Sequence, residues 1–194
     1  MKKFKSVSIV KHPKALVWKA MRDRLPEMVP FLDNVASITQ IHRDERMAGC
    51  VRLINLWKAD VKIPAAIQSI IDAPNVSWLD RAEWSEGRSE CRWSIEPQFL
   101  TDAIRCTGST HFEPAIGGAG TRITFEGELE ISANNIPGLP GFAQTAASHA
   151  MESLVTSLVP KNFRKITDAL SILLERKSPK RTAPRAAGKS TKSN

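Results

Sequence analysis

The chain has 194 residues, of which 42% are hydrophobic, so it is long and apolar enough for one globular domain and is not a largely disordered protein. Its net charge of +8 is uneven: residues 175–194 contain seven Lys or Arg and one acidic residue, whereas residues 1–174 contain 21 basic and 19 acidic residues. A nearly neutral body lacks the basic face of a nucleic-acid-binding domain, so nucleic acid is not an expected partner.

The cysteines and the N-terminal segment bear on cellular location. Cys50, Cys91 and Cys106 are odd in number and widely spaced, which makes a poor disulfide framework and favours reduced thiols. The basic start from Met1 to Lys5 is not followed by the apolar run of a signal peptide, and no run is long enough to span a membrane. We therefore expect a cytoplasmic protein.

Strands are predicted where apolar and polar residues alternate. In the first of them, Val7 and Ile9 share one face. Turn residues separate the later strands, most clearly Gly117-Gly118-Ala119-Gly120. The expected strands are residues 4–10, 35–44, 50–58, 76–84, 90–97, 103–114 and 121–132.

Helices are predicted where apolar residues recur every three or four positions. His12-Pro13 opens one helix, and Pro26 begins a short second piece that ends at Leu32. An amphipathic helical insert is expected from Ile63 to Ile71, and a long helix over 142–174, with a kink or break at Pro160. Residues 175–194 contain too little apolar area to order themselves, so residues 1–174 form the predicted domain and 175–194 a basic disordered tail.

The order of these elements predicts the fold. A strand, two helices, six strands with one helical insert and a long helix favour an α+β domain. Its expected form is a helix-grip arrangement, in which a curved antiparallel sheet of about seven strands wraps around the long C-terminal helix.

This order resembles the START-like superfamily (SRPBCC; polyketide cyclase/dehydrase and lipid transport). The resemblance extends over residues 1–174 and rests on order and spacing. Its carriers are His12-Pro13 and Val17-Trp18 after the first strand, the strands between Trp78 and Phe112, the last strand from Gly120 to Leu129, and the terminal helix.

A narrower likeness is to PRELI-type lipid-transfer domains. It rests on the insert from Ile63 to Ile71 and on the strand that ends His111-Phe112-Glu113-Pro114. Members of the START-like superfamily enclose an apolar cavity between sheet and helix. The resemblance therefore implies binding or transport of a hydrophobic small molecule or lipid, or alternatively a cyclase/dehydratase-type reaction in the same cavity.

Alternation along the strands also predicts which residues face inward. The turns place Trp93 opposite Gly108 and Cys91 opposite Thr110. They also place Gly108 opposite Leu129, and Thr110 opposite Gly127. Two readings of the glycines remain open, because they either accommodate the Trp93 indole or leave room for a ligand.

Two polar residues share the inward parity. Asn55 lies between Leu53 and Trp57, and Asp80 lies between Trp78 and Ala82. Buried polar groups need partners, so this pair either bonds with itself or the backbone, or orients the polar end of a ligand.

The candidate cavity residues combine these inward positions with one face of the long helix. His149 is a further polar candidate, although a surface histidine is the alternative, and a cyclase reaction would use Asp80 with His149. No metal-ligand spacing, nucleophile elbow or nucleotide fingerprint is present, so no cofactor is expected. The candidates are Asn55, Trp57, Trp78, Asp80, Trp93, Cys106, Gly108, Thr110, Phe112, Phe125, Gly127, Leu129, Ala146, His149 and Ala150.

The basic tail has three possible roles. It would approach an anionic membrane, with a gain of roughly 1 kcal/mol per cation near the surface. It would otherwise bind nucleic acid loosely, or act only as a solubilising segment without a partner.

Overall fold

The computed structural model describes residues 1–60, 76–98, 104–132 and 162–176. Its seven strands form one antiparallel sheet in the order β1, β7, β6, β5, β4, β3, β2, which confirms the predicted fold class. The elements are β1 (Lys2–Val10), α1 (Lys14–Asp23), η1 (Leu25–Phe31), β2 (Val35–Asp44), β3 (Cys50–Ala59), β4 (Ser77–Ser85), β5 (Glu90–Pro97), β6 (Ile104–Ala115), η2 (Ile116–Gly118) and β7 (Gly120–Ile131), followed by helical residues 162–176.

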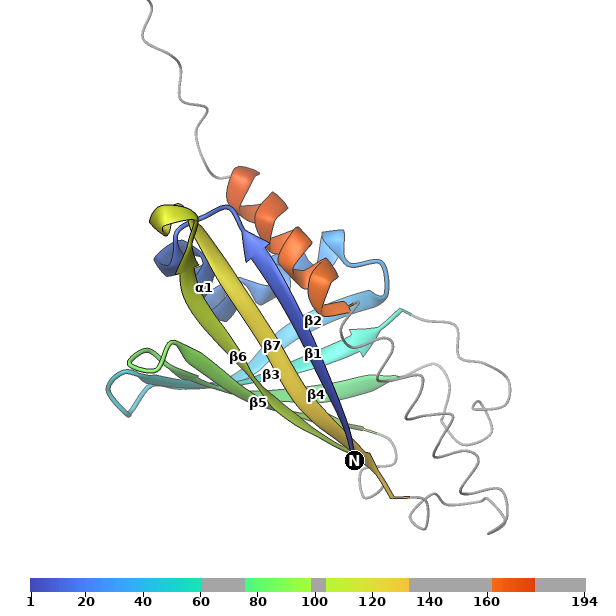
Figure 1. Ribbon diagram of the computed structural model, residues 1–194. Helices are drawn as coiled ribbons and strands as arrows, with labels where there is room; N and C mark the ends of the chain where they lie inside the picture. Colours follow the sequence, from blue (N-terminus) through green and yellow to red (C-terminus); the bar gives the residue numbers. More distant parts are fainter. Residues whose placement is uncertain (61–75, 99–103, 133–161, 177–194) are drawn as a thin grey trace, which may run out of the picture.

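The sheet changes direction strongly across its width. Figure 1 shows β1, β7 and β6 running steeply across the direction of β3, β4 and β5. This is the ordinary accumulated twist of an open sheet, and it gives the sheet one concave face. α1 and helix 162–176 both place aromatic side chains against that face.

Aromatic side chains join α1 to the sheet. The Trp18 ring lies edge-on to Trp84 and Phe112, with centroid separations of 5.0 and 5.1 Å. Such pairs contribute about 0.5–1.5 kcal/mol each beyond the area they bury. Val17 and Met21 are buried on the same helix, so α1 closes one end of the concave face.

The contacts that hold the C-terminal helix include three side-chain pairs, in addition to its buried Leu170 and Leu173. Phe163 stacks on Phe125 at 4.2 Å, Lys165 donates to the Asp33 carboxylate at 2.7 Å, and the Arg176 guanidinium lies 4.7 Å from the Phe31 ring centroid. The helix therefore includes Glu175 and Arg176, which the sequence placed in the tail. The remainder of the predicted long helix, the insert 63–71 and residues 177–194 lie outside the described residues.

No helix within the described ranges is long and apolar enough to cross a membrane.

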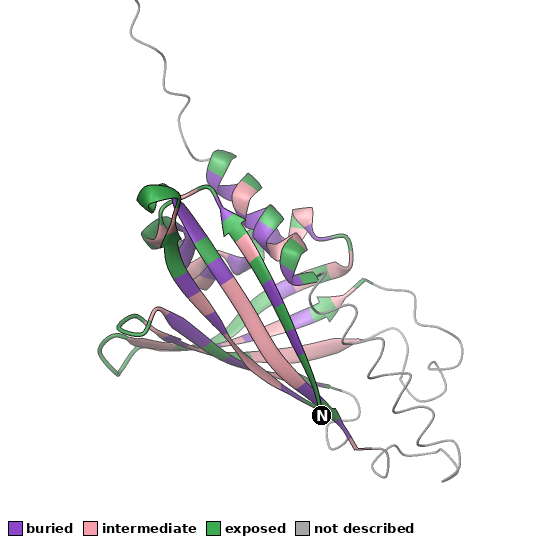
Figure 2. Ribbon diagram, in the orientation of Figure 1, coloured by how far each residue is buried: buried purple, intermediate pink, exposed green. Residues whose placement is uncertain are grey.

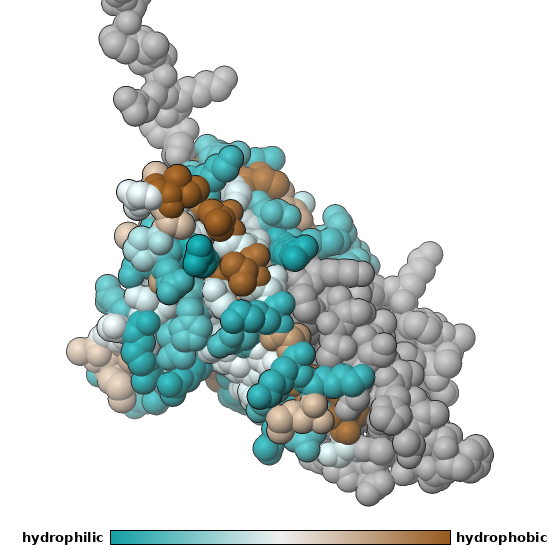
Figure 3. Space-filling model, viewed as in Figure 1, coloured by the Kyte–Doolittle hydropathy of each residue, from teal (hydrophilic) through white to brown (hydrophobic). Residues whose placement is uncertain are grey.

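The face of β1 that carries Val7 and Ile9 is the outer one. Val7 is 48% exposed and Ile9 54% exposed, whereas Phe4, Ser6 and Val10 are buried. Pairing of Ser6 with Phe125 in β7 sets this parity, because Phe125 faces the concave side. Figure 3 shows the resulting hydrophobic side chains along the upper part of β1, on a surface that is otherwise mostly hydrophilic.

The register between β6 and β7 differs from the predicted one by two residues. Gly108 pairs with Gly127, and Thr110 pairs with Phe125, rather than with Leu129 and Gly127. The cause is a tight turn that starts earlier than expected, in which Ile116, Gly117 and Gly118 have φ of 51°, 60° and 89°. A register shift of two residues leaves each residue on the same face of the sheet, so the predicted inward-facing residues remain inward-facing. The predicted pairs of β5 with β6, Trp93 with Gly108 and Cys91 with Thr110, are confirmed.

Candidate functional site

The concave face is divided into a packed half and a partly accessible half. Towards α1, inward residues such as Thr110, Phe112 and Ile123 are buried. Towards the other end some inward residues keep accessible surface, including those in the pink stretch of β4 in Figure 2, whereas Trp57, Leu129 and Ile131 beside them are buried. This partly accessible set comprises Trp78, Asp80, Ile95, Ile104 and Phe125.

Asp80 and Asn55 form the polar centre of this accessible half. They are paired across β3 and β4, and the Asn55 amide Nδ2 donates to Asp80 Oδ2 at 3.2 Å. Asn55 is 3% exposed, so its amide is held by the sheet rather than by solvent. The first alternative from the sequence, that the two residues bond each other, is therefore observed.

The environment of Asp80 disfavours its charged form. Burial raises the pKa of Asp80 to about 6, although the nearby Asn55 amide and Trp57 indole act in the opposite direction. The Trp57 Nε1–H nevertheless makes no hydrogen bond of normal distance and angle. Trp57 stacks on Trp78 at 5.6 Å, so the carboxyl group lies beside an aromatic wall. The Asp80 side chain thus has dense surroundings on the concave face and keeps some accessible surface.

The raised pKa of Asp80 predicts a loss of stability as the pH rises from 3.8 to about 6. In that window the folded chain retains a proton that the unfolded chain releases, so the free energy of unfolding falls with pH, by about 3 kcal/mol. Asp80→Asn cannot titrate and removes this contribution. Urea unfolding of both proteins at about pH 4 and about pH 7 checks the difference between them. An equal difference at both values would contradict the raised pKa.

Trp93 occupies the space beside the two glycines. A Cβ atom on Gly108 would lie 2.4 Å from Trp93 Cζ2, and one on Gly127 would lie 2.6 Å from Trp93 Cη2. The indole Nε1–H donates to Thr110 Oγ1 at 3.2 Å, and the ring stacks on Phe125 at 4.8 Å. The open space that one reading placed at these glycines is therefore filled by the indole, as the other reading predicted.

Comparisons with known proteins support the same architecture. No protein-family model matches the sequence, and neither does any curated protein. Solved structures similar to this chain include protein TTHA0849 from Thermus thermophilus, with 21% identity, a TM-score of 0.61, and coverage of 91% of this chain and 100% of that one. The Zhui aromatase/cyclase from Streptomyces sp. R1128 has 14% identity and a TM-score of 0.63 over 92% of this chain and 96% of that one. Ara h 8.0201 has 17% identity and a TM-score of 0.57 over 90% and 98%.

The chain therefore shares a helix-grip fold with these solved structures. The matches extend over nine-tenths of its length, as the superfamily resemblance predicted. Similarity at this level of identity establishes the architecture, and the chemistry of the site has to be argued from its own residues.

The remaining sequence candidates fall into three groups. Cys106 and Leu129 are packed in the core, and burial raises the pKa of Cys106 to about 11, which keeps it an inert thiol. Phe112 belongs to the cluster that holds α1. The third group, Ala146, His149 and Ala150, lies outside the described residues.

The accessible half also contains two residues that were not among the candidates. Ile95 pairs with Asp80 across β4 and β5, and Ile104 follows on β6. Ile95 shares the inward parity of Trp93 on β5, and Ile104 shares that of Gly108 on β6. Their accessibility was not predictable, because it depends on where the helices leave the concave face uncovered.

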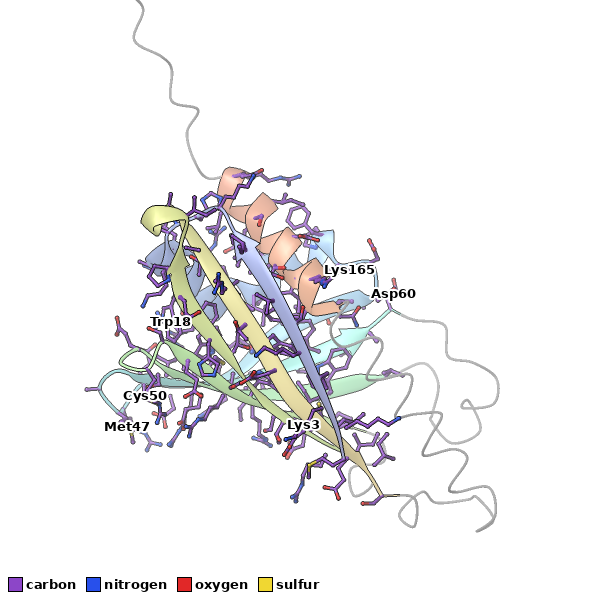
Figure 4. All side chains as sticks on the ribbon, in the orientation of Figure 1. Lys3, Trp18, Met47, Cys50, Asp60 and Lys165 are labelled. Carbon is purple, nitrogen blue, oxygen red and sulfur yellow. The ribbon has the colours of Figure 1, made fainter. Side chains whose placement is uncertain are left out.

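Two hollows lined by described residues lie away from Asp80. A groove of about 550 Å³ on the outer face is lined by the charged side chains of Lys3, Lys5 and Glu126, among others. A pocket of about 130 Å³ lies at the β2–β3 turn, beside Trp18, Met47 and Cys50, which are labelled at the left of Figure 4. The charged lining of the larger hollow suits no apolar ligand. Among the described residues, no three His, Cys, Asp or Glu side chains are grouped to hold a metal.

Proposed function

We propose that this START-like domain binds a hydrophobic small molecule or lipid on its concave face, against Asp80 and Asn55. The observation that carries the proposal is a hydrogen-bonded polar pair in a partly accessible wall formed otherwise by Trp78, Ile95 and Ile104. Ligand sites in proteins combine a mostly apolar lining with a few placed polar groups. The shared fold with an aromatase/cyclase is compatible with an apolar or aromatic ligand.

Filling the accessible half tests this function. Ile95→Trp adds a large ring beside Asp80, and we expect it to weaken binding of the neutral dye N-phenyl-1-naphthylamine by at least about tenfold, because the ring takes the ligand's space. Ser94→Trp is the matched control, since Ser94 is similarly accessible but faces the opposite side of β5. Dye fluorescence titration with thermal melting of all three proteins makes the comparison.

The two variants separate the faces of the sheet. Loss of binding in the folded Ile95→Trp protein alone supports the concave site. Equal dye affinity in wild type and a folded Ile95→Trp protein would place the ligand elsewhere. Loss in the Ser94→Trp protein alone would point to the outer face.

A second candidate function is acid–base chemistry on a bound substrate. A carboxyl group with a pKa of about 6 exchanges protons readily near neutral pH. Its partner in the sequence-based hypothesis, His149, lies outside the described residues. Exchange of solvent deuterium into the carbon next to the carbonyl of a bound ketone, followed by mass spectrometry, tests this activity. The exchange should disappear in Asp80→Asn.

The basic segment carries a separate proposal. Residues 177–194 contain six Lys or Arg and no acidic residue. We infer that this segment brings the lipid-binding domain to anionic membranes, with a gain of roughly 1 kcal/mol per cation near the surface. Deletion of residues 177–194 spares Arg176 and its contact with Phe31, so the melting temperature should stay unchanged. Sedimentation with anionic vesicles should decrease, and equal sedimentation of the full and truncated chains would remove the membrane role.

A further inference from the structure

The polar pair also restricts the chemistry of the ligand. We infer that the ligand presents a hydroxyl group to Asp80 and Trp57, rather than a free carboxylate or an ether oxygen. This inference rests on the proposed function and deepens it by naming the polar end of the apolar molecule. It follows from three features of the site: unused acceptor capacity, an unused donor and the absence, among the described residues, of a compensating positive charge.

Asp80 has acceptor capacity to spare. An ionised carboxylate offers about four lone-pair positions. Among the described residues, Asp80 accepts one hydrogen bond of normal geometry, from Asn55 at 3.2 Å. Asn55 itself is almost completely buried, so the sheet holds this donor in place. A ligand that donates a hydrogen bond therefore finds a prepared acceptor.

Trp57 supplies the complementary donor. Its side chain is more than nine-tenths buried, and its Nε1–H makes no hydrogen bond of normal distance and angle within the described part of the chain, although it approaches the Asp80 carboxylate. The indole lies close enough to the Asp80 carboxylate to lower the pKa of that group. A hydroxyl group can accept from the indole while it donates to the carboxylate. An ether or a carboxylate satisfies only the indole, and an ammonium group satisfies only the carboxylate.

No positive charge within the described ranges offsets the carboxylate. Its pKa responds to burial and to two neutral side chains, and no described ion pair includes it. Above a pH of about 6 an anionic ligand would thus meet an uncompensated negative charge. Repulsion between like charges is strong in surroundings of low dielectric, which disfavours a fatty-acid anion.

Three ligands of equal chain length test the inference on the unmodified, full-length protein. Decan-1-ol, its methyl ether and decanoate compete with N-phenyl-1-naphthylamine at about pH 8, where Asp80 is ionised. We expect the alcohol to bind at least about tenfold more tightly than either competitor, because it alone uses both the acceptor and the donor. An ether or a carboxylate that binds as tightly as the alcohol would overturn the inference and leave the proposed function intact.

Failure of the proposed function has a different signature. If the dye itself does not bind, no apolar site exists and the inference falls with it. Asp80→Leu removes the acceptor and keeps the branching of the side chain, and it should bring the alcohol and the ether to within about threefold of each other while dye binding is kept. The matched control is Glu83→Leu, on the outer face of the same strand, where Glu83 pairs with Arg52 at 2.9 Å. The control should retain the preference for the alcohol, and a preference retained in a folded Asp80→Leu protein would overturn the inference.

Discussion

Gly108→Ala is expected to lower the free energy of unfolding by about 3 kcal/mol or more. The new Cβ atom would lie 2.2 Å from the backbone oxygen of Glu126 and 2.4 Å from Trp93 Cζ2. Neither neighbour can move freely, because the oxygen belongs to the adjacent strand and the indole is stacked on Phe125. Urea unfolding followed by tryptophan fluorescence measures the loss.

Gly87→Ala is the control for this substitution. Gly87 lies in the β4–β5 turn with no heavy atom within 4 Å of its added Cβ, so its replacement should change stability by no more than about 0.5 kcal/mol. Adding Trp93→Phe to Gly108→Ala removes the outer indole ring atoms and should recover part of the loss. A Gly108→Ala protein as stable as wild type would show that the indole does not sit on the glycine pair.

Phe163→Ala should cost about 3–5 kcal/mol, because it removes the aromatic side chain that joins the C-terminal helix to the sheet. Phe163 is 3% exposed and stacks on Phe125 at 4.2 Å, and Phe125 in turn stacks on Trp93. Truncation therefore leaves a cavity at the end of an aromatic column. Thermal and urea unfolding, with near-ultraviolet circular dichroism to report on ring packing, measure the effect.

Ile172→Ala is the matched truncation on the same helix. Ile172 is 39% exposed, so its loss should cost less than about 1 kcal/mol. Equal losses for the two variants would mean that helix propensity, rather than the aromatic contact, determines how strongly the helix is held.

Much of the architecture was predictable from the sequence, for reasons that are local. Alternation with a period of two depends only on the geometry of a strand, so it identified all seven strands and placed Asn55 and Asp80 on one face. Local turns also determined the pairing of Trp93 with Gly108. The predicted β6–β7 pairing was wrong by two residues, because the positive φ of Ile116 moves the turn. No residue pattern predicts this backbone conformation at an isoleucine.

The site depended on information that the sequence does not hold locally. Alternation and the turns together placed Gly108, Gly127 and Trp93 on one face, but they did not distinguish a ligand space from a filled one. The short distances between the indole and the glycines show that the indole fills this space. Alternation also predicted that Val7 and Ile9 share a face of β1. It did not show that this face is the outer one, because the orientation of β1 depends on its pairing with β7.

The sequence by itself determined the order of elements, the inward parity of each strand and the concentration of positive charge near the C-terminus, because these follow from residue type and spacing along the chain. Only the tertiary structure decided which half of the concave face remains accessible and that Asp80 lies there beside Asn55 and a Trp57 N–H that makes no hydrogen bond of normal geometry among the described residues. The accessibility of the concave face and the pKa of a buried carboxyl group depend on side chains from distant parts of the chain. No local sequence pattern predicts which of these side chains come into contact.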